Sequence, residues 1–196
     1  MGNVLNLSEF TWINPPHEFS LEIDRLTIIT DPETDFWQRT YYGFQNDNGH
    51  AFVNKTEGDF TLTVKTDFEA VSQYDQCGII LYHDSENWIK GSVELVNKQF
   101  ARLGSVVTNL GFSDWASTDI SSAVTSMWYR FSRRGQDFCI ENSFDGNAFY
   151  QMRIFHMHNP LAGARVGLYA ASPLKSSFKA IFTNIEIREC IWHDHP

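Results

Sequence analysis

The stretch from Tyr74 to Leu95 carries the side chains best suited to chemistry. It reads YDQCGIILYHDSENWIKGSVEL, an apolar run interrupted by polar and aromatic residues. Five side chains stand out: Gln76, Tyr82, Trp88, Lys90 and Glu94. Aromatic planes stack on sugar rings, while amide, ammonium and carboxylate groups bond to hydroxyls, so this set is typical of a polyol site. The alternative is a solvated sheet face with a Lys90–Glu94 ion pair. We favour a ligand groove because a solvated face rarely needs tryptophan and tyrosine.

Two strands joined by a polar turn must position these five residues. Residues 77–83 and 88–95 alternate in the manner of strands, and Asp84-Ser-Glu-Asn87 separates them. Successive side chains of a strand point to opposite faces of the sheet. Ile89 and Val93 are therefore predicted to face the core, and the five candidates share the outward surface of a hairpin, which is concave if the sheet curves.

Four further side chains are candidates for the same surface. Arg130 and Glu141 alternate away from apolar neighbours, Arg102 precedes another strand-like run, and Trp37 lies within the segment 35–44. Each of them, taken singly, is more typical of a structural or surface residue. Together with the first five they make up the predicted ligand-binding set.

A hydrolytic role would need two convergent carboxyl groups. Retaining glycosidases place them about 5–5.5 Å apart, and inverting ones about 6.5–9.5 Å apart. Catalytic sandwiches of this general shape often carry Glu-x-Asp-x-Glu on one strand, but Ser92 and Val96 flank Glu94 at those positions. A pairing of Glu94 with Glu141 or Asp75 would have to assemble across strands. We therefore expect no catalytic residues and keep a glycoside hydrolase as an alternative.

No motif indicates a metal or a cofactor. The segment Asn46-Asp-Asn-Gly49 is better explained as a turn than as a calcium loop, because Phe44 would occupy the first ligand position. There is no phosphate loop and no nucleophile elbow. We expect neither a metal site nor a cofactor.

Composition narrows the class of protein and of partner. The chain has 196 residues, of which 42% are hydrophobic and 15% aromatic, which suits one domain with a sizeable core. Its net charge of −9 disfavours nucleic acid and anionic membranes. No stretch approaches the ~20 apolar residues of a membrane span. Three cysteines and no signal-like N-terminus predict reduced thiols and a cytoplasmic location.

Period-two alternation recurs along most of the chain. Residues 59–68 are a clear half-buried strand, and 21–30 and 40–44 are also predicted to be strands. Asn48-Gly49 and Asp145-Gly146 are strong hairpin signals. About ten to twelve short strands, with no helical period, predict an all-β sandwich or barrel made of one domain spanning residues 1–196.

Seven motifs occur in order along the chain. They are FTWINPP (10–16), DFWQRTYYGF (35–44), YDQCG (74–78), WIK (88–90), SVVT (105–108), SDW (113–115) and VGLYAASP (166–173). Together they resemble the regulation-of-enolase family of concanavalin A-like β-sandwich proteins, from about residue 10 to residue 189. The resemblance implies a jelly-roll sandwich of two curved antiparallel sheets. The family name suggests regulation around glycolysis or galactose use, and a shared fold does not establish a shared function.

The leading hypothesis is non-catalytic recognition of a carbohydrate or sugar-like metabolite, coupled to the regulation of carbohydrate metabolism. The alternative is an interaction protein whose aromatic face docks a glycolytic enzyme such as enolase. A groove deep enough to bury a ring favours the first. A flat apolar patch larger than a few hundred Å² favours the second. Two carboxyl groups at hydrolase spacing favour the hydrolase.

Overall fold

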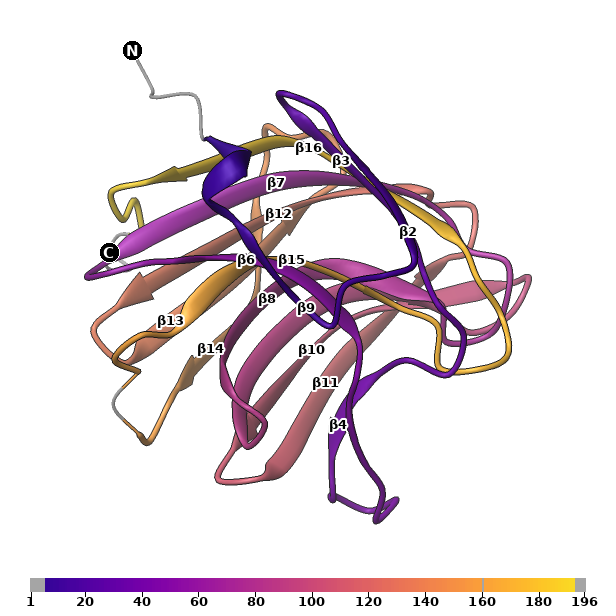
Figure 1. The fold of residues 1–196 in the computed structure, drawn as a ribbon, viewed down its shortest axis with the longest axis horizontal. Helices are drawn as coiled ribbons and strands as arrows, with labels where there is room; N and C mark the ends of the chain where they lie inside the picture. Colours follow the sequence, from indigo (N-terminus) through magenta and orange to yellow (C-terminus); the bar gives the residue numbers. More distant parts are fainter. Residues whose placement is uncertain (1–5, 160, 193–196) are drawn as a thin grey trace.

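The computed structural model describes residues 6–159 and 161–192, and the other residues of the predicted 1–196 domain lie outside the described part. One short 3-10 turn, η1 (Leu7–Glu9), precedes sixteen strands in this part of the chain. The strands form two seven-stranded antiparallel sheets and one small hairpin (Figure 1). The predicted all-β concanavalin A-like sandwich is confirmed, although it has more strands than the ten to twelve expected.

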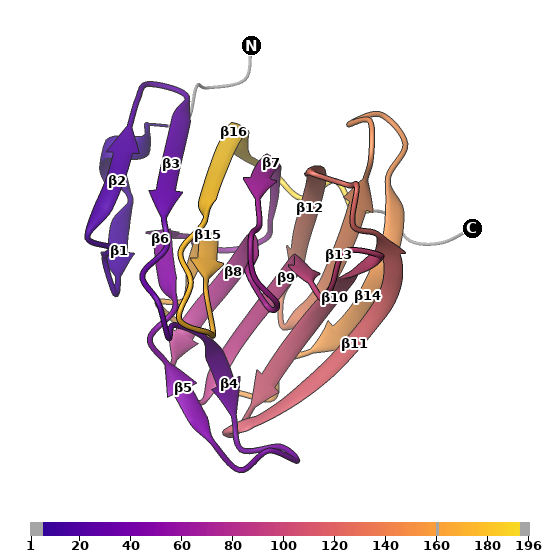
Figure 2. The ribbon, with the colours of Figure 1, turned by 90° about the vertical axis from the view of Figure 1, so that its right-hand side faces the viewer.

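Each sheet is named here by its strand order. Sheet A runs β1 (Thr11–Ile13), β6 (His50–Lys55), β15 (Arg165–Ala171), β8 (Gln76–Asp84), β9 (Asn87–Leu95), β10 (Phe100–Asn109) and β11 (Phe112–Ser121). Sheet B runs β14 (Tyr150–His156), β13 (Asp137–Ser143), β12 (Ser126–Arg134), β7 (Phe60–Glu69), β16 (Lys179–Arg188), β3 (Arg25–Ile29) and β2 (Glu18–Leu21). Both sheets curve, and they stack face to face (Figure 2).

The main core fills the space between the sheets. Alternation along β8 and β9 sends Ile79, Leu81, Ile89 and Val93 into it, as predicted. Tyr129 of sheet B packs against the same cluster. Each of these side chains is almost fully removed from water, and burial of apolar surface is the main favourable contribution to folding.

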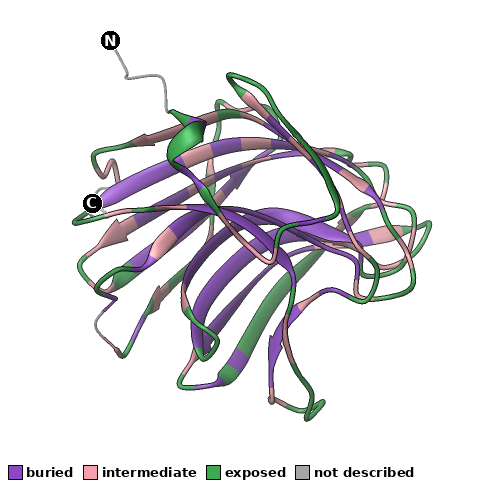
Figure 3. Cartoon of the chain, viewed as in Figure 1, coloured by how far each residue is buried: buried purple, intermediate pink, exposed green. Residues whose placement is uncertain are grey.

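A second apolar cluster lies on the opposite face of sheet A. It forms because residues 35–47, here called the tongue, fold over that face as the hairpin β4 (Phe36–Gln38) and β5 (Gln45–Asp47). Phe36 packs against Trp88, with ring centres 5.7 Å apart, and against Tyr82 and Tyr169. As a result β8 and β9 are buried on both faces, whereas the edge strand β11 is mostly exposed (Figure 3).

Three of the secondary-structure assignments made from the sequence were wrong, all within residues 21–49. Residues 40–44 are the loop of the tongue rather than a strand, since residues 40–42 form a turn and Tyr41 and Gly43 have positive φ. Asn48-Gly49 joins β5 to β6, which belong to different sheets and do not pair. Residues 21–30 divide into the end of β2 and β3, because the exposed segment 22–24 between them turns the chain back on itself.

Candidate functional site

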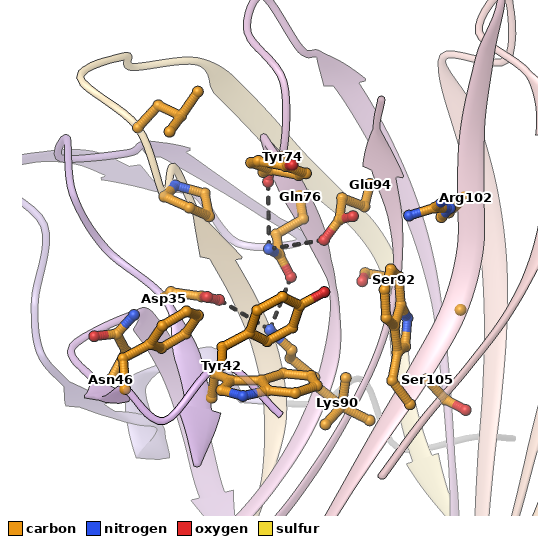
Figure 4. A pocket seen from close by; sticks show the side chains of 17 residues that line it. Asp35, Tyr42, Asn46, Tyr74, Gln76, Lys90, Ser92, Glu94, Arg102 and Ser105 are labelled. Carbon is orange, nitrogen blue, oxygen red and sulfur yellow. Dashed lines mark hydrogen bonds and ion pairs between the residues drawn. The ribbon is translucent and has the colours of Figure 1, made fainter. Parts of the chain in front are cut away.

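A pocket of about 390 Å³ opens between the tongue and the strands β8 to β11 of sheet A (Figure 4). Its floor comes from alternate residues of β8, β9 and β10, which point away from the main core. The tongue supplies one side of the pocket, β11 supplies Trp115, and the segment after β15 supplies Pro173 and Leu174. The pocket therefore exists only because the tongue folds over the sheet.

A buried polar network makes up the floor. The ammonium group of Lys90 donates to Asp35 Oδ1 at 3.0 Å and to Gln76 Oε1 at 2.9 Å (Figure 4). Gln76 Oε1 also accepts a hydrogen bond from the Tyr169 hydroxyl at 3.0 Å. The Lys90 side chain is only 5% exposed. Since Lys90 is paired with Asp35 of the tongue, the predicted alternative of a solvated Lys90–Glu94 pair is wrong.

Glu94 is the only floor carboxylate, among the described residues, with a buried oxygen that has no partner. Its Oε2 accepts from Gln76 Nε2 at 3.3 Å, while its Oε1 is buried and unpaired. Burial raises the pKa of Glu94 to about 7; the negative charge of Asp35 adds to this, and the positive charges of Lys90 and Arg102 oppose it. Near neutral pH this carboxyl group therefore exists in both protonation states.

Arg102 and Trp115 occupy the β10–β11 side of the pocket. Arg102 stands directly across from Glu94 in the β9–β10 register. Its guanidinium carbon lies 5.1 Å from the Trp115 ring centre, and its nearest ion-pair partner, Asp119, is 3.7 Å away. Gly104 makes room for the indole, because a Cβ at that position would come within 3.0 Å of Trp115 Nε1.

The tongue contributes an aromatic side to the pocket. Tyr42 stacks on Phe44 with ring centres 5.4 Å apart and also contacts the edge of Trp37. The indole nitrogen of Trp37 donates to the Thr40 carbonyl at 3.1 Å, which fixes the loop. Tyr42 and Phe44 keep about half of their surface exposed. Flat rings that remain accessible beside a polar floor are suited to stacking on a ligand ring.

The structure brings together five of the nine predicted site residues. Those that line the pocket are Trp37, Gln76, Lys90, Glu94 and Arg102. Tyr82 and Trp88 share their face of the sheet but lie beneath the tongue, in the second cluster. Trp88 is fully buried, and the Tyr82 hydroxyl donates to Asp47 Oδ2 at 2.8 Å. The prediction that these two residues lie on an outward surface was wrong, because the tongue covers them.

Arg130 and Glu141 lie elsewhere. They form an ion pair at 3.4 Å on the outer face of sheet B, where Arg130 also stacks on the Phe149 ring at 3.8 Å. The whole sandwich separates this pair from the pocket, since the core-facing neighbours of both residues pack between the sheets. Their placement in the same site as Lys90 was wrong. Alternation reveals the face of a strand but not the sheet to which it belongs.

Several pocket residues were missed by the sequence-based reasoning. They are Asp35, Tyr42, Phe44, Asn46, Tyr74, Ser92, Ser105, Trp115 and Leu174. Asp35, Tyr42 and Phe44 were visible within the motif DFWQRTYYGF, whose aromatic density is unusual for a turn. Trp115 stood in the SDW motif, on a strand that is exposed at nearly every position. Nothing in the sequence placed the tongue over sheet A.

Within residues 6–159 and 161–192, no group of three or more His, Cys, Asp or Glu side chains is placed to hold a metal ion. No helix in this part of the chain is long and apolar enough to cross a membrane. The cysteines at positions 77, 139 and 190 are unpaired.

Comparison with known proteins places the chain in a family. Residues 12–190 match the family model described as protein of unknown function (DUF1349). The chain belongs to this family. A Saccharomyces cerevisiae relative named Regulation of enolase protein 1 is 38% identical over 124 residues, which cover 63% of this chain and 62% of the relative. The match therefore spans less than two thirds of that protein, and it confirms the resemblance inferred from the motifs.

Solved structures show how widely the sandwich is shared. The crystal structure of a functionally unknown protein from Saccharomyces cerevisiae has a TM-score of 0.89 and 30% identity, covering 96% of this chain and all of that one. The GH43 protein BlXynB from Bacillus licheniformis has a TM-score of 0.70 at 15% identity, covering 94% of this chain and 37% of that one. An alginate lyase from Klebsiella pneumoniae has a TM-score of 0.59 at 9% identity, covering 88% and 84%. The latter two similarities establish the fold alone.

Proposed function

We propose that the pocket binds a sugar or sugar-like metabolite without turning it over, and that this binding lets the protein regulate carbohydrate metabolism in the cytoplasm. The observation that carries the proposal is the combination of exposed aromatic rings with a polar floor. Tyr42 and Phe44 stand on the tongue side, Trp115 stands on the β11 side, and the Lys90 network lies beneath them. Such a pairing of ring faces with hydroxyl-binding groups suits a polyol.

The size of the pocket supports this choice of ligand. Its volume of about 390 Å³ corresponds to roughly 13 waters at ~30 Å³ each. A hexose has about twelve non-hydrogen atoms, and bonded atoms take less space than separate waters, so one ring fits with room to spare. A concave site of this volume favours recognition of a small molecule over docking of a flat protein surface, which the sequence left as the alternative.

The arrangement of the carboxyl groups supports a non-catalytic role. Asp35 Oδ1 is held by the Lys90 ammonium and by the Phe36 backbone N–H at 2.7 Å. Glu94 lies on the other side of Lys90 and Gln76 in the same network. The ion pair and the backbone bond occupy Asp35 Oδ1, so this oxygen is not free to act as the nucleophile or base that paired carboxyl catalysis needs. A glycoside hydrolase is therefore the weaker alternative.

The name of the yeast relative supports the regulatory part of the proposal. That protein is named for the regulation of enolase, and we extend such a role to this chain as a proposal. A docking role with a glycolytic enzyme is the second candidate, favoured by the tongue tip, where Tyr41 is 92% exposed beside Tyr42. The two roles are compatible if a bound sugar changes how the tongue is presented.

Calorimetric titration with a panel of mono- and oligosaccharides tests the proposal. Trp115→Ala and Tyr42→Ala should each weaken binding by about tenfold, which is 1.4 kcal/mol. Tyr41→Ala is the matched control, because Tyr41 neighbours Tyr42 but does not line the pocket, and it should bind as the wild type does. If no sugar binds, and purified enolase is retained by the wild type but not by Tyr41→Ala, the docking role replaces sugar recognition.

A further inference from the structure

The charges that line the pocket do not cancel. Four Asp, Glu, Lys or Arg side chains line it: Asp35, Lys90, Glu94 and Arg102. Lys90 and Asp35 neutralise each other at 3.0 Å, and both are largely buried. What remains is the guanidinium of Arg102 opposite the carboxyl of Glu94. The character of the ligand depends on how far those two groups satisfy each other.

Protein groups only weakly satisfy the charge and the hydrogen-bond donors of the Arg102 guanidinium. Within residues 6–159 and 161–192 its one ion pair is with Asp119 at 3.7 Å, longer than a charge-assisted hydrogen bond of about 2.7–2.9 Å. Asp119 is 67% exposed on the edge strand β11, where water screens such a pair. The guanidinium is otherwise held by ring contacts with Trp115 and Phe100. A planar guanidinium that lies near two aromatic rings, with only one long ion pair, keeps N–H donors for bidentate binding of an oxyanion.

Glu94 does not complete the pairing. Although Arg102 and Glu94 are direct cross-strand neighbours, no ion pair joins them among the described residues. Oε2 of Glu94 accepts from Gln76, and the unpaired Oε1 is buried. A space between the two side chains is visible in Figure 4. The Arg102 side of the pocket thus keeps a positive charge, in a chain whose net charge is −9.

We infer that the ligand is an acidic sugar, whose single carboxylate or phosphate meets the Arg102 guanidinium while its ring lies beside Trp115 and its hydroxyls reach the Gln76 and Glu94 end of the floor. This inference rests on the proposed function and narrows it to a class of ligand. A negative group gives Arg102 the partner that Asp119 supplies poorly, and the hydroxyls bond to the Gln76 and Glu94 side chains that line the other end of the floor.

Ionisation of Glu94 makes the preference for an acidic sugar over a neutral one depend on pH. The charged groups around it are Lys90 on its own strand, Asp35 from the tongue and Arg102 from β10, and Tyr169 approaches from β15. Its pKa of about 7 means that the carboxyl group is mostly protonated at pH 6 and mostly ionised at pH 8. The ionised form repels an anionic ligand beside Arg102. Affinity for an acidic sugar therefore falls as pH rises, whereas affinity for a neutral sugar does not.

Titration of the wild type with D-glucuronate and D-galacturonate, compared with D-glucose and D-galactose, tests the inference at constant ionic strength. At pH 6 a uronate should bind at least tenfold more tightly than the matching neutral sugar, and this advantage should shrink severalfold at pH 8. D-glucose 6-phosphate is titrated at pH 8 only, because a phosphate monoester itself titrates near pH 6. Its rank against the uronates decides between carboxylate and phosphate.

Two variants locate the effect. Arg102→Gln should weaken uronate binding about tenfold more than it weakens glucose binding, and Glu94→Gln should bind uronate equally at pH 6 and pH 8. Arg130→Gln, which removes an arginine from the outer face of sheet B, is the matched control and should behave as the wild type. Equal affinity for charged and neutral sugars, or equal losses for both in Arg102→Gln, overturns the inference and leaves sugar recognition intact. Absence of binding by every sugar removes both proposals.

Discussion

Two ion pairs on opposite sides of the sandwich begin from the same pattern in the sequence. Lys90 pairs with Asp35 at 3.0 Å, and Arg130 pairs with Glu141 at 3.4 Å, and both cations alternate away from core residues. The first pair is buried beneath the tongue and forms the floor of a pocket. The second remains on the outer face of sheet B, with both side chains about one-fifth exposed. The difference comes from what covers each face, so a polar side chain opposite the core becomes part of a site only where another segment folds over it.

Among variants that test the difference between the two ion pairs, Lys90→Ala should lower the free energy of unfolding most. Removing the cation leaves the buried carboxylate of Asp35 without its partner, which typically costs about 3–5 kcal/mol. Lys179→Ala is the matched control, because Lys179 pairs with Glu69 on the exposed surface, and it should change stability by less than about 0.5 kcal/mol. Urea unfolding of both variants measures the difference. A cost below 1 kcal/mol for Lys90→Ala would contradict the buried pair.

Phe36→Ala should cause the next largest loss of stability. Phe36 is fully buried in the second cluster, and truncation of a buried phenylalanine removes about 3 kcal/mol or more. Because Phe36 attaches the tongue to sheet A, the variant should also lose ligand binding through displacement of Asp35 and Trp37. Phe36→Leu keeps most of the apolar volume and should retain both properties. Unfolding midpoints and saccharide titrations, made on the same samples, check the two effects together.

Glu94→Gln should change how the stability of the protein depends on pH. The folded-state pKa of Glu94 is about 7, above its ordinary value of 4.5. The folded state therefore holds this proton more tightly than the unfolded state, so the wild type loses stability as pH rises from about 4.5 to about 7. Above that range the ionised carboxyl group costs a few kcal/mol. Glu94→Gln should match the wild type near pH 4 and exceed its stability at pH 8, as measured by urea unfolding at several pH values. A stability difference that stays constant with pH would disprove the shifted pKa.

The smallest effect is expected for Arg130→Ala. This change removes a partly exposed ion pair and the stack on Phe149, which together are worth about 1–2 kcal/mol. It should leave saccharide affinity unchanged, since the pair lies across the sandwich from the pocket. A loss of binding in this variant, with folding intact, would mean that the outer face of sheet B takes part in recognition.

Much of the fold was predictable because alternation is a local property. It correctly directed Ile89 and Val93 into the core and Lys90 and Glu94 to the other face, and the ordered motifs indicated the sandwich. Which segment covers that second face was not predictable, because contacts between the tongue and sheet A join residues far apart in the chain. One local signal was available in residues 79–82, whose continuous apolar run Ile-Ile-Leu-Tyr indicates burial on both faces. If these strands are taken to be buried on both faces, Tyr82 and Trp88 are predicted to be core residues beneath another segment instead of ligand-binding residues.

The tongue shares no backbone ladder with either large sheet, because β4 and β5 pair only with each other. Side chains attach it, through Phe36 in the second cluster, the Asp35–Lys90 pair and the bond from Tyr82 to Asp47. Changing the length of the loop 39–44 between β4 and β5 costs little loop-closure entropy, about 0.6 kcal/mol for each doubling. Evolution can therefore redraw the pocket by altering one short segment while the sandwich stays as it is, and homologous chains with the same scaffold are free to diverge in what they bind.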